Sequence, residues 1–136
     1  MIAIDVALVA ALNANSPFKA LATNGVHNPV EKQGILPPLL RIQEISEPFE
    51  AVLSNRRAIT RALYQLTGVA VDAPTKGGKR GAQEIRDAAL AAITGLTVAG
   101  YSVEVRPLRN LGTYSEDTGG LLWWFAPAYV QITLAS

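Results

Sequence analysis

The sequence contains no cysteine, one histidine and few charged residues. The absence of cysteine excludes disulfides, thiolate metal ligands and a thiol nucleophile. Because His27 is the single histidine, no site that needs two imidazoles can form. Charged side chains make up 17% of the chain, against about 25% in average soluble domains, whereas 49% of the residues are hydrophobic. This low share of charge predicts that partner molecules cover part of the surface.

Long apolar runs are also missing. No run approaches the roughly 20 residues that cross a bilayer, so we expect no membrane partner. Residues 1–12 carry Asp5 and lack a basic leading segment, so they do not have the form of a signal peptide, and synthesis in the cytoplasm of the producing cell is expected. The net charge of +1 excludes a global field that would attract nucleic acid. At 136 residues, the chain is expected to form one domain, 1–136.

The clearest element that the sequence predicts is an amphipathic helix from Gly81 to Leu96. Arg86 belongs to its polar side, where an alanine substitution is expected to cost less than about 0.5 kcal/mol. Several stripe positions are alanine, so the helix can lie close against a flat partner such as a sheet. The apolar stripe consists of Ile85, Ala88, Ala89, Ala92, Ile93 and Leu96.

The rest of the chain predicts an α+β domain, with a mainly antiparallel sheet of about four strands packed against two helices. Gly68 is expected to mark a bulge or bend within the second strand. Segment 46–57 reads as a polar connection with room for a short turn of helix, and segment 110–120 as a wide turn. The strands are expected at residues 39–46, 59–71, 101–108 and 121–134.

The N-terminal region predicts a helix followed by a long surface arm. The helix is expected to end before residues 13–17, with one face formed by Ile2, Val6, Val9 and Ala10. Residues 18–36 then contain Asn-Gly and Asn-Pro pairs and are followed by Pro-Pro at 37–38. This composition predicts an irregular arm whose partner lies elsewhere, with short extended pieces around Val26 and Val30.

No catalytic site is predicted. No serine lies in a nucleophile elbow, and no cluster of His, Asp and Glu has metal-ligand spacing. His27 is expected to be an ordinary surface residue, and Glu116 and Asp117 to cap a turn rather than to exchange protons. We therefore expect no enzyme activity, no cofactor and no metal.

A basic loop before the central helix, KGGKRG, invites comparison with a phosphate-binding loop. A Walker loop requires Ser or Thr after its lysine, whereas Arg80 follows Lys79. Lys76, Lys79 and Arg80 instead place three positive charges within five residues, between flexible glycines. Such a loop either contacts DNA without sequence preference or is simply solvated at an outer rim.

The run Leu121, Leu122, Trp123, Trp124 and Phe125 is more informative. Neighbouring side chains in a strand point to opposite faces, so five consecutive large apolar residues place apolar side chains on both faces of the sheet. One face can cover the domain's own helices. The other would be an exposed apolar patch that marks an interaction site, unless the strand is sandwiched inside a single core. The low charge of the chain favours an interface between copies.

Together these motifs resemble the tail-completion, or tail-terminator, proteins of long-tailed bacteriophages. The resemblance covers most of the chain: an N-terminal helix, a strand at 39–46 reached through a proline, and a strand running into a helix, ALYQLTGVAVDAPTKGGKRGAQEIRDAALAAI. It continues through VEVRPL and the Asp-Thr-Gly turn at 117–119 to the C-terminal strand that ends AYVQITL. The Gly77–Gly81 insertion is longer than the family pattern usually shows.

The resemblance implies a structural protein of the virion. Such proteins assemble as a hexameric ring on the head-proximal end of the tail tube, end its polymerisation and meet the head connector. The implied partners are other copies of this chain, the tail tube protein, the head connector or stopper protein and double-stranded DNA passing through the ring. A head-closure component of the neck and a small ligand-binding or enzymatic α+β domain remain the alternatives.

Overall fold

The computed structural model describes residues 4–27, 36–52, 58–72 and 77–135, with side chains at all of these except 47–52 and 58. Within these residues the chain forms three helices and six strands. The helices are α1 (Ile4–Asn13), α2 (Ser16–Leu21) and α3 (Gly78–Ile93), and the strands are β1 (Val26–His27), β2 (Leu39–Val52), β3 (Ala58–Val71), β4 (Ser102–Asn110), β5 (Tyr114–Thr118) and β6 (Leu121–Ala135).

All six strands belong to one sheet, in the order β1-β2-β3-β6-β4. Strand β5 also pairs with β6, against its first residues, whereas β4 pairs with its later residues. Every pairing is antiparallel except the parallel pair β1–β2. The predicted α+β class with a mainly antiparallel sheet is therefore confirmed, with six strands instead of about four and three helices instead of two.

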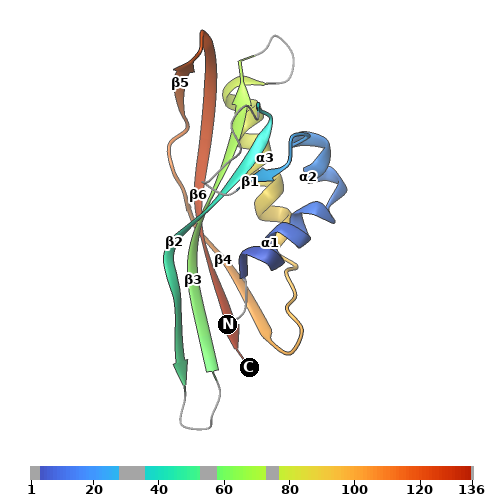
Figure 1. Ribbon diagram of the computed structural model, residues 1–136, viewed down its shortest axis with the longest axis vertical. Helices are drawn as coiled ribbons and strands as arrows, with labels where there is room; N and C mark the ends of the chain where they lie inside the picture. The colour runs from blue at the N-terminus through green and yellow to red at the C-terminus, as the bar shows by residue number, and fades with distance from the viewer. Residues whose placement is uncertain (1–3, 28–35, 53–57, 73–76, 136) are drawn as a thin grey trace.

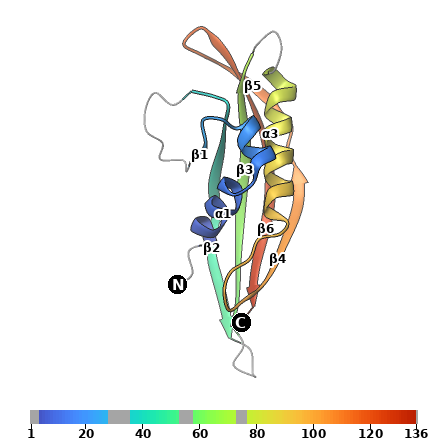
Figure 2. The same ribbon diagram turned by 90° about the vertical axis from the view of Figure 1, so that its right-hand side faces the viewer.

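The three helices pack on one face of this sheet, called here the covered face (Figures 1 and 2). Alternation along the strands fixes which side chains meet the helices: Ala62, Tyr64 and Leu66 of β3 are all buried against them. Burying an aliphatic side chain of this kind stabilises the fold by about 1.5–3 kcal/mol. The main core also contains Leu8, Leu12, Phe18, Ile85, Ala89, Ile93, Val130, Ile132 and Leu134.

Gly68 allows α3 to lie directly against β3. A Cβ atom at this position would overlap the carbonyl oxygen of Ala82 and lie 2.9 Å from the backbone nitrogen of Arg86. The pairing of β3 with both neighbours continues through Gly68 without a shift in register, so the expected bulge is wrong. The glycine is needed for close approach of a helix rather than for a change in the strand.

Pairing between strands places several element boundaries elsewhere than the sequence predicts. Strand β2 continues to Val52 by pairing with β3, so residues 46–52 are not the expected connection or helical turn. The register shift between Ser46 and Phe49 spans Pro48, and a bulge is where a strand tolerates proline. The predicted wide turn at 110–120 contains β5, because residues 114–118 pair with β6.

Helix α3 begins at Gly78 and ends at Ile93, so each end lies three residues before the predicted one. Its apolar stripe is largely confirmed, since Ile85, Ala89 and Ile93 are buried. Arg86 was expected on the exposed side, and that is wrong: it is 7% exposed. It lies where the helix backbone meets Gly68, and its Nε donates to Asp87 at 2.9 Å.

The N-terminal helix uses a different face from the predicted one. Ile4, Leu8 and Leu12 are buried, whereas Val6 is 65% exposed and Ala10 is exposed as well. Ile2 lies outside the described residues. The apolar residues of α1 almost encircle it, so periodicity alone could not select the face that the sheet covers.

The predicted irregular arm at 18–36 is wrong at its start, because residues 18–21 are helical. Residues 16–21 form α2, where the side chain of Asn15 accepts a hydrogen bond from the Phe18 backbone at 2.9 Å. Phe18 is 1% exposed and belongs to the main core. The extended piece expected at Val26 is confirmed as β1, whereas Val30 lies outside the described residues.

The sheet is much longer than the layer of helices. Strand β6 has 15 residues, which span about 50 Å, whereas the 16 residues of α3 span about 24 Å. The sheet therefore projects beyond the helices: β2 and β3 do so at one end, and β5 and β6 at the other (Figures 1 and 2). This leaves much of the sheet without a covering layer.

Candidate functional site

The face of the sheet opposite the helices, called here the uncovered face, has an apolar end near the β5–β6 hairpin. The cross-strand neighbours Leu39, Val69 and Phe125 form a small second core there, all 3% exposed or less. The ring of Tyr114 stacks on Phe125 with 5.2 Å between centroids. The Arg41 guanidinium lies 5.2 Å from the centroid of the same Phe125 ring. These contacts close the apolar end with residues of the domain itself.

Further along the strands, the uncovered face becomes polar and carries arginines. Residues paired directly across antiparallel strands point to the same face, so the register defines rows of side chains. Three successive rows run from β4 towards β2: Arg109, Tyr129, Gln65 and Gln43; then Arg106, Gln131 and Leu63; then Glu104, Thr133 and Arg61.

The junction between the apolar and polar parts is hollowed. A depression of about 240 Å³ is lined by Arg41, Gln43, Gln65, Thr67 and Tyr114. The Gln65 side chain donates to the Thr67 hydroxyl at 3.3 Å. Amide, hydroxyl and guanidinium groups therefore dominate this part of the face, and none of the described residues that line the depression is a carboxylate or a histidine.

The predicted interaction run 121–125 divides among three environments. Leu121 and Leu122 lie in the β5–β6 hairpin and are 49% and 36% exposed. Trp124 packs against the main core, and Trp123 packs against the second core on the uncovered face. Phe125 is buried. The alternation of faces is confirmed, but it is the two leucines that remain exposed for a partner, and their role as an interface stays a prediction.

Both tryptophans in this run carry a buried indole N–H without a hydrogen-bond acceptor. An unsatisfied buried donor costs about 1–3 kcal/mol. The polar ends of both indoles are therefore enclosed by the domain, although the two tryptophan side chains as a whole are half-buried.

The described part of the basic loop, residues 77–81, forms the N-cap and first turn of α3 and therefore lies on the helix side of the sheet. Lys79 and Arg80 are exposed in the first turn of α3, whereas Lys76 lies outside the described residues. The Arg80 Nε is 3.3 Å from the Glu84 Oε1, in an ion pair whose side chains are 90% and 50% exposed. An exposed pair of this kind contributes about 0–1 kcal/mol. The predicted contact of this loop with DNA stays a prediction.

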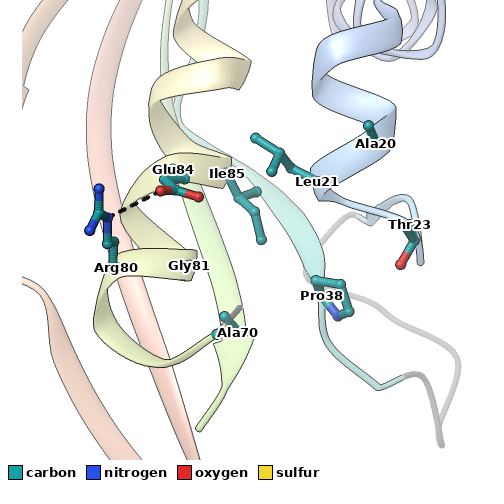
Figure 3. A pocket seen from close by; sticks show the side chains of 10 residues that line it. Ala20, Leu21, Thr23, Pro38, Ala70, Arg80, Gly81, Glu84 and Ile85 are labelled. Carbon is teal, nitrogen blue, oxygen red and sulfur yellow. Dashed lines mark ion pairs between the residues drawn. The ribbon is translucent and has the colours of Figure 1, made fainter. Parts of the chain in front are cut away.

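A hollow of about 400 Å³ separates α2 from the start of α3 (Figure 3). Leu21 and Ile85 point towards one another across it, and Pro38 and Ala70 complete much of its apolar wall. Its carboxylate, Glu84, is already paired with Arg80. The described residues that line the hollow offer apolar contact but no nucleophile next to a base.

The remaining residues considered for chemistry have structural roles. Asp117 Oδ1 accepts a hydrogen bond from the Gly120 backbone at 3.2 Å, so the predicted turn-capping role is confirmed for this carboxylate. The Nε2 atom of His27 lies 2.7 Å from the carbonyl oxygen of Asn24 in the same turn. In the described ranges, no three metal-ligating side chains gather, and no helix has the length and apolarity to span a bilayer.

No family model and no curated protein matches this sequence. The fold does match a solved structure, a chain from the virion of a native gene transfer agent particle. The two chains are 14% identical and superpose with a TM-score of 0.74, over 98% of this chain and 96% of the other. The likeness therefore establishes that the two chains share a fold along nearly their whole lengths.

Proposed function

We propose that this chain is a structural protein of a tailed virion, and that it closes as a ring on the head-proximal end of the tail tube. The observation that carries the proposal is the fold shared with a chain of a virion particle, over 98% of this chain. The sequence motifs add the resemblance to tail-terminator proteins.

The edges of the sheet support assembly into a ring. Strand β1 pairs only with Leu40 and Arg41, which leaves residues 42–52 of β2 unpaired on that side among the described residues. The outer side of β4 is the other edge of the sheet. Unpaired strand edges are templates for pairing with another chain. Two different edges can join head to tail, and such a contact generates a ring when the rotation closes.

The proposed partners follow from this position. Copies of the chain form a homohexamer, one side of the ring meets the tail tube protein, and the other side meets the head connector or stopper protein. Double-stranded DNA passes through the centre. The ring ends polymerisation of the tube and joins the tail to the head, so the protein is located in the neck of the virion.

Inactivation of the gene in the producing cell tests this function. The expected result is tails of uncontrolled length that do not join heads, seen by electron microscopy of the lysate. Tails of normal length beside heads that lose their DNA would contradict a terminator and favour a head-closure component. Normal virions would contradict any structural role in the neck.

Native mass spectrometry of the purified chain, alone and mixed with tail tubes, tests the ring. A hexamer under either condition agrees with the proposal. A monomer in both conditions would overturn it. Tight binding of a small molecule by that monomer would favour the ligand-binding alternative.

A further inference from the structure

We propose that the polar part of the uncovered sheet face, called here the arginine face, contacts the phosphate backbone of the DNA that passes through the ring. The face is defined by Arg61, Arg106 and Arg109, with the polar side chains that lie between them. The inference rests on the proposed function, because it assigns a side of this domain to the lumen of that ring.

The register places the three arginines on one surface. Arg106 and Arg109 lie on β4, and Arg61 lies on β3, two strands away across β6. Adjacent strands are about 4.8 Å apart, so the arginines border a band about 10 Å wide. All three are exposed, and none forms an ion pair with a described residue. Their guanidinium groups are therefore available to an external anion.

The charge of this surface differs from that of the rest of the chain. Among the described side chains in the three rows of the arginine face, Glu104 is the single carboxylate, so these side chains carry a charge of +2. The whole chain carries +1, so everything else sums to −1. The rows on the face that no described helix covers are therefore net positive in a chain that is almost neutral. Charge complementarity therefore favours a polyanion as the occupant.

The side chains between the arginines fit a backbone rather than base edges. Gln65, Gln131 and Thr133 provide amide and hydroxyl groups, which contact phosphate and sugar without reading sequence. The face is the side of a broad sheet and presents no helix or narrow ribbon that would enter a groove. Contacts of this kind weaken with salt and allow DNA to slide. This is what a ring requires if it must guide DNA without holding it.

The arginine face and the basic loop are alternative candidates for the surface that contacts DNA in the lumen. Lys79 and Arg80 belong to α3, which packs on the opposite side of the sheet (Figure 2). A ring whose wall is one domain thick cannot turn both sides towards the same lumen. Arg80 is also paired with Glu84, whereas the three sheet arginines have no such partner among the described residues.

The test compares a sheet variant, Arg61→Gln/Arg106→Gln/Arg109→Gln, which removes three charges, with a loop variant, Lys79→Gln/Arg80→Gln, which removes two. All five positions are exposed, so both variants are expected to keep the wild-type melting temperature and the wild-type oligomer in native mass spectrometry. Binding of the assembled rings to a labelled, blunt-ended DNA duplex is then measured by fluorescence anisotropy from 50 to 200 mM salt.

The expected result is that the sheet variant loses about tenfold or more in DNA affinity at low salt and has a shallower salt dependence, whereas the loop variant resembles wild type. The reverse order would overturn the inference and assign DNA contact to the loop. Wild-type rings that bind no DNA, or equal losses in the two variants, would also overturn it. Failure of the proposed function is a separate outcome, because wild-type chains would then form no ring.

Discussion

At the scale of single residues, Gly68 sets how closely helix and sheet approach. Gly68→Ala would force a Cβ atom against the α3 backbone at Ala82 and Arg86, which cannot move aside as a side chain could. Overpacking of this kind costs about 1–3 kcal/mol. We expect that loss in the free energy of unfolding measured with urea. The control is Gly112→Ala, where an added Cβ meets nothing within 4 Å; equal effects of the two substitutions would contradict the close approach.

Ionisation of the buried Tyr64 makes the stability of the fold depend on pH. Burial, followed by the nearby carboxylates of Glu44 and Asp5, raises the pKa of Tyr64 to about 12, from 10.0. The folded state therefore holds this proton more tightly than the unfolded chain does. The resulting stability is fully present below pH 10 and is lost as the pH rises through 12.

The corresponding prediction is that Tyr64→Phe reduces the decline of stability above pH 10. The free energy of unfolding of wild type should fall by about 2 kcal/mol more than that of the variant between pH 10 and 12. Denaturant titrations of both proteins across this range measure the difference. Parallel declines would show that ionisation of Tyr64 is not linked to unfolding.

At the scale of elements, the buried face of α3 governs its contribution to stability. Ile93 is fully buried, so Ile93→Asp places an unpaired charge in the core, which should cost several kcal/mol and unfold a typical domain. Ala91→Asp, at an exposed position of the same helix, should cost no more than about 0.7 kcal/mol. Thermal unfolding followed by circular dichroism distinguishes the two, and similar losses would mean that the helix packs by another face.

The expected effect of Arg86→Ala on the free energy of unfolding must be revised upwards. Its burial at the contact with the sheet means that Arg86→Ala removes packing of the aliphatic stem as well as the ion pair with Asp87. We expect a loss of about 1–2 kcal/mol in the same unfolding measurement, above the 0.5 kcal/mol that an exposed position would give. A loss within 0.5 kcal/mol would show that the buried arginine contributes no net packing.

At the scale of the whole molecule, the β5–β6 hairpin is expected to hold copies together. Leu121 and Leu122 are exposed, so Leu121→Asp/Leu122→Asp should leave the folded monomer within about 0.5 kcal/mol of wild type. The same change should abolish the ring in native mass spectrometry, because burying an unpaired carboxylate in an interface costs a large desolvation free energy. Val6→Asp, at another exposed apolar residue, is the control. Rings that survive the hairpin variant would remove these leucines from the interface.

The sequence by itself determined the features that depend on neighbours along the chain. The period-two pattern of residues 59–71 and 121–134 predicted β3 and β6, and the spacing of Ile85, Ala89 and Ile93 predicted the buried side of α3. Each pattern repeats several times along its own segment, so it remains visible whatever the segment packs against. The α+β class and the division of residues 121–125 between two faces followed from the same patterns.

Only the tertiary structure decided the features that depend on distant partners. Residues 46–52 and 114–118 become strands because β3 and β6 supply hydrogen bonds that no local pattern encodes. The buried side of α1, the enclosure of Arg86 and the need for Gly68 all follow from where a helix meets the sheet. The gathering of Arg61, Arg106 and Arg109 on one uncovered face depends on register across three strands. Residues more than 40 positions apart in the sequence become neighbours only when those strands pair.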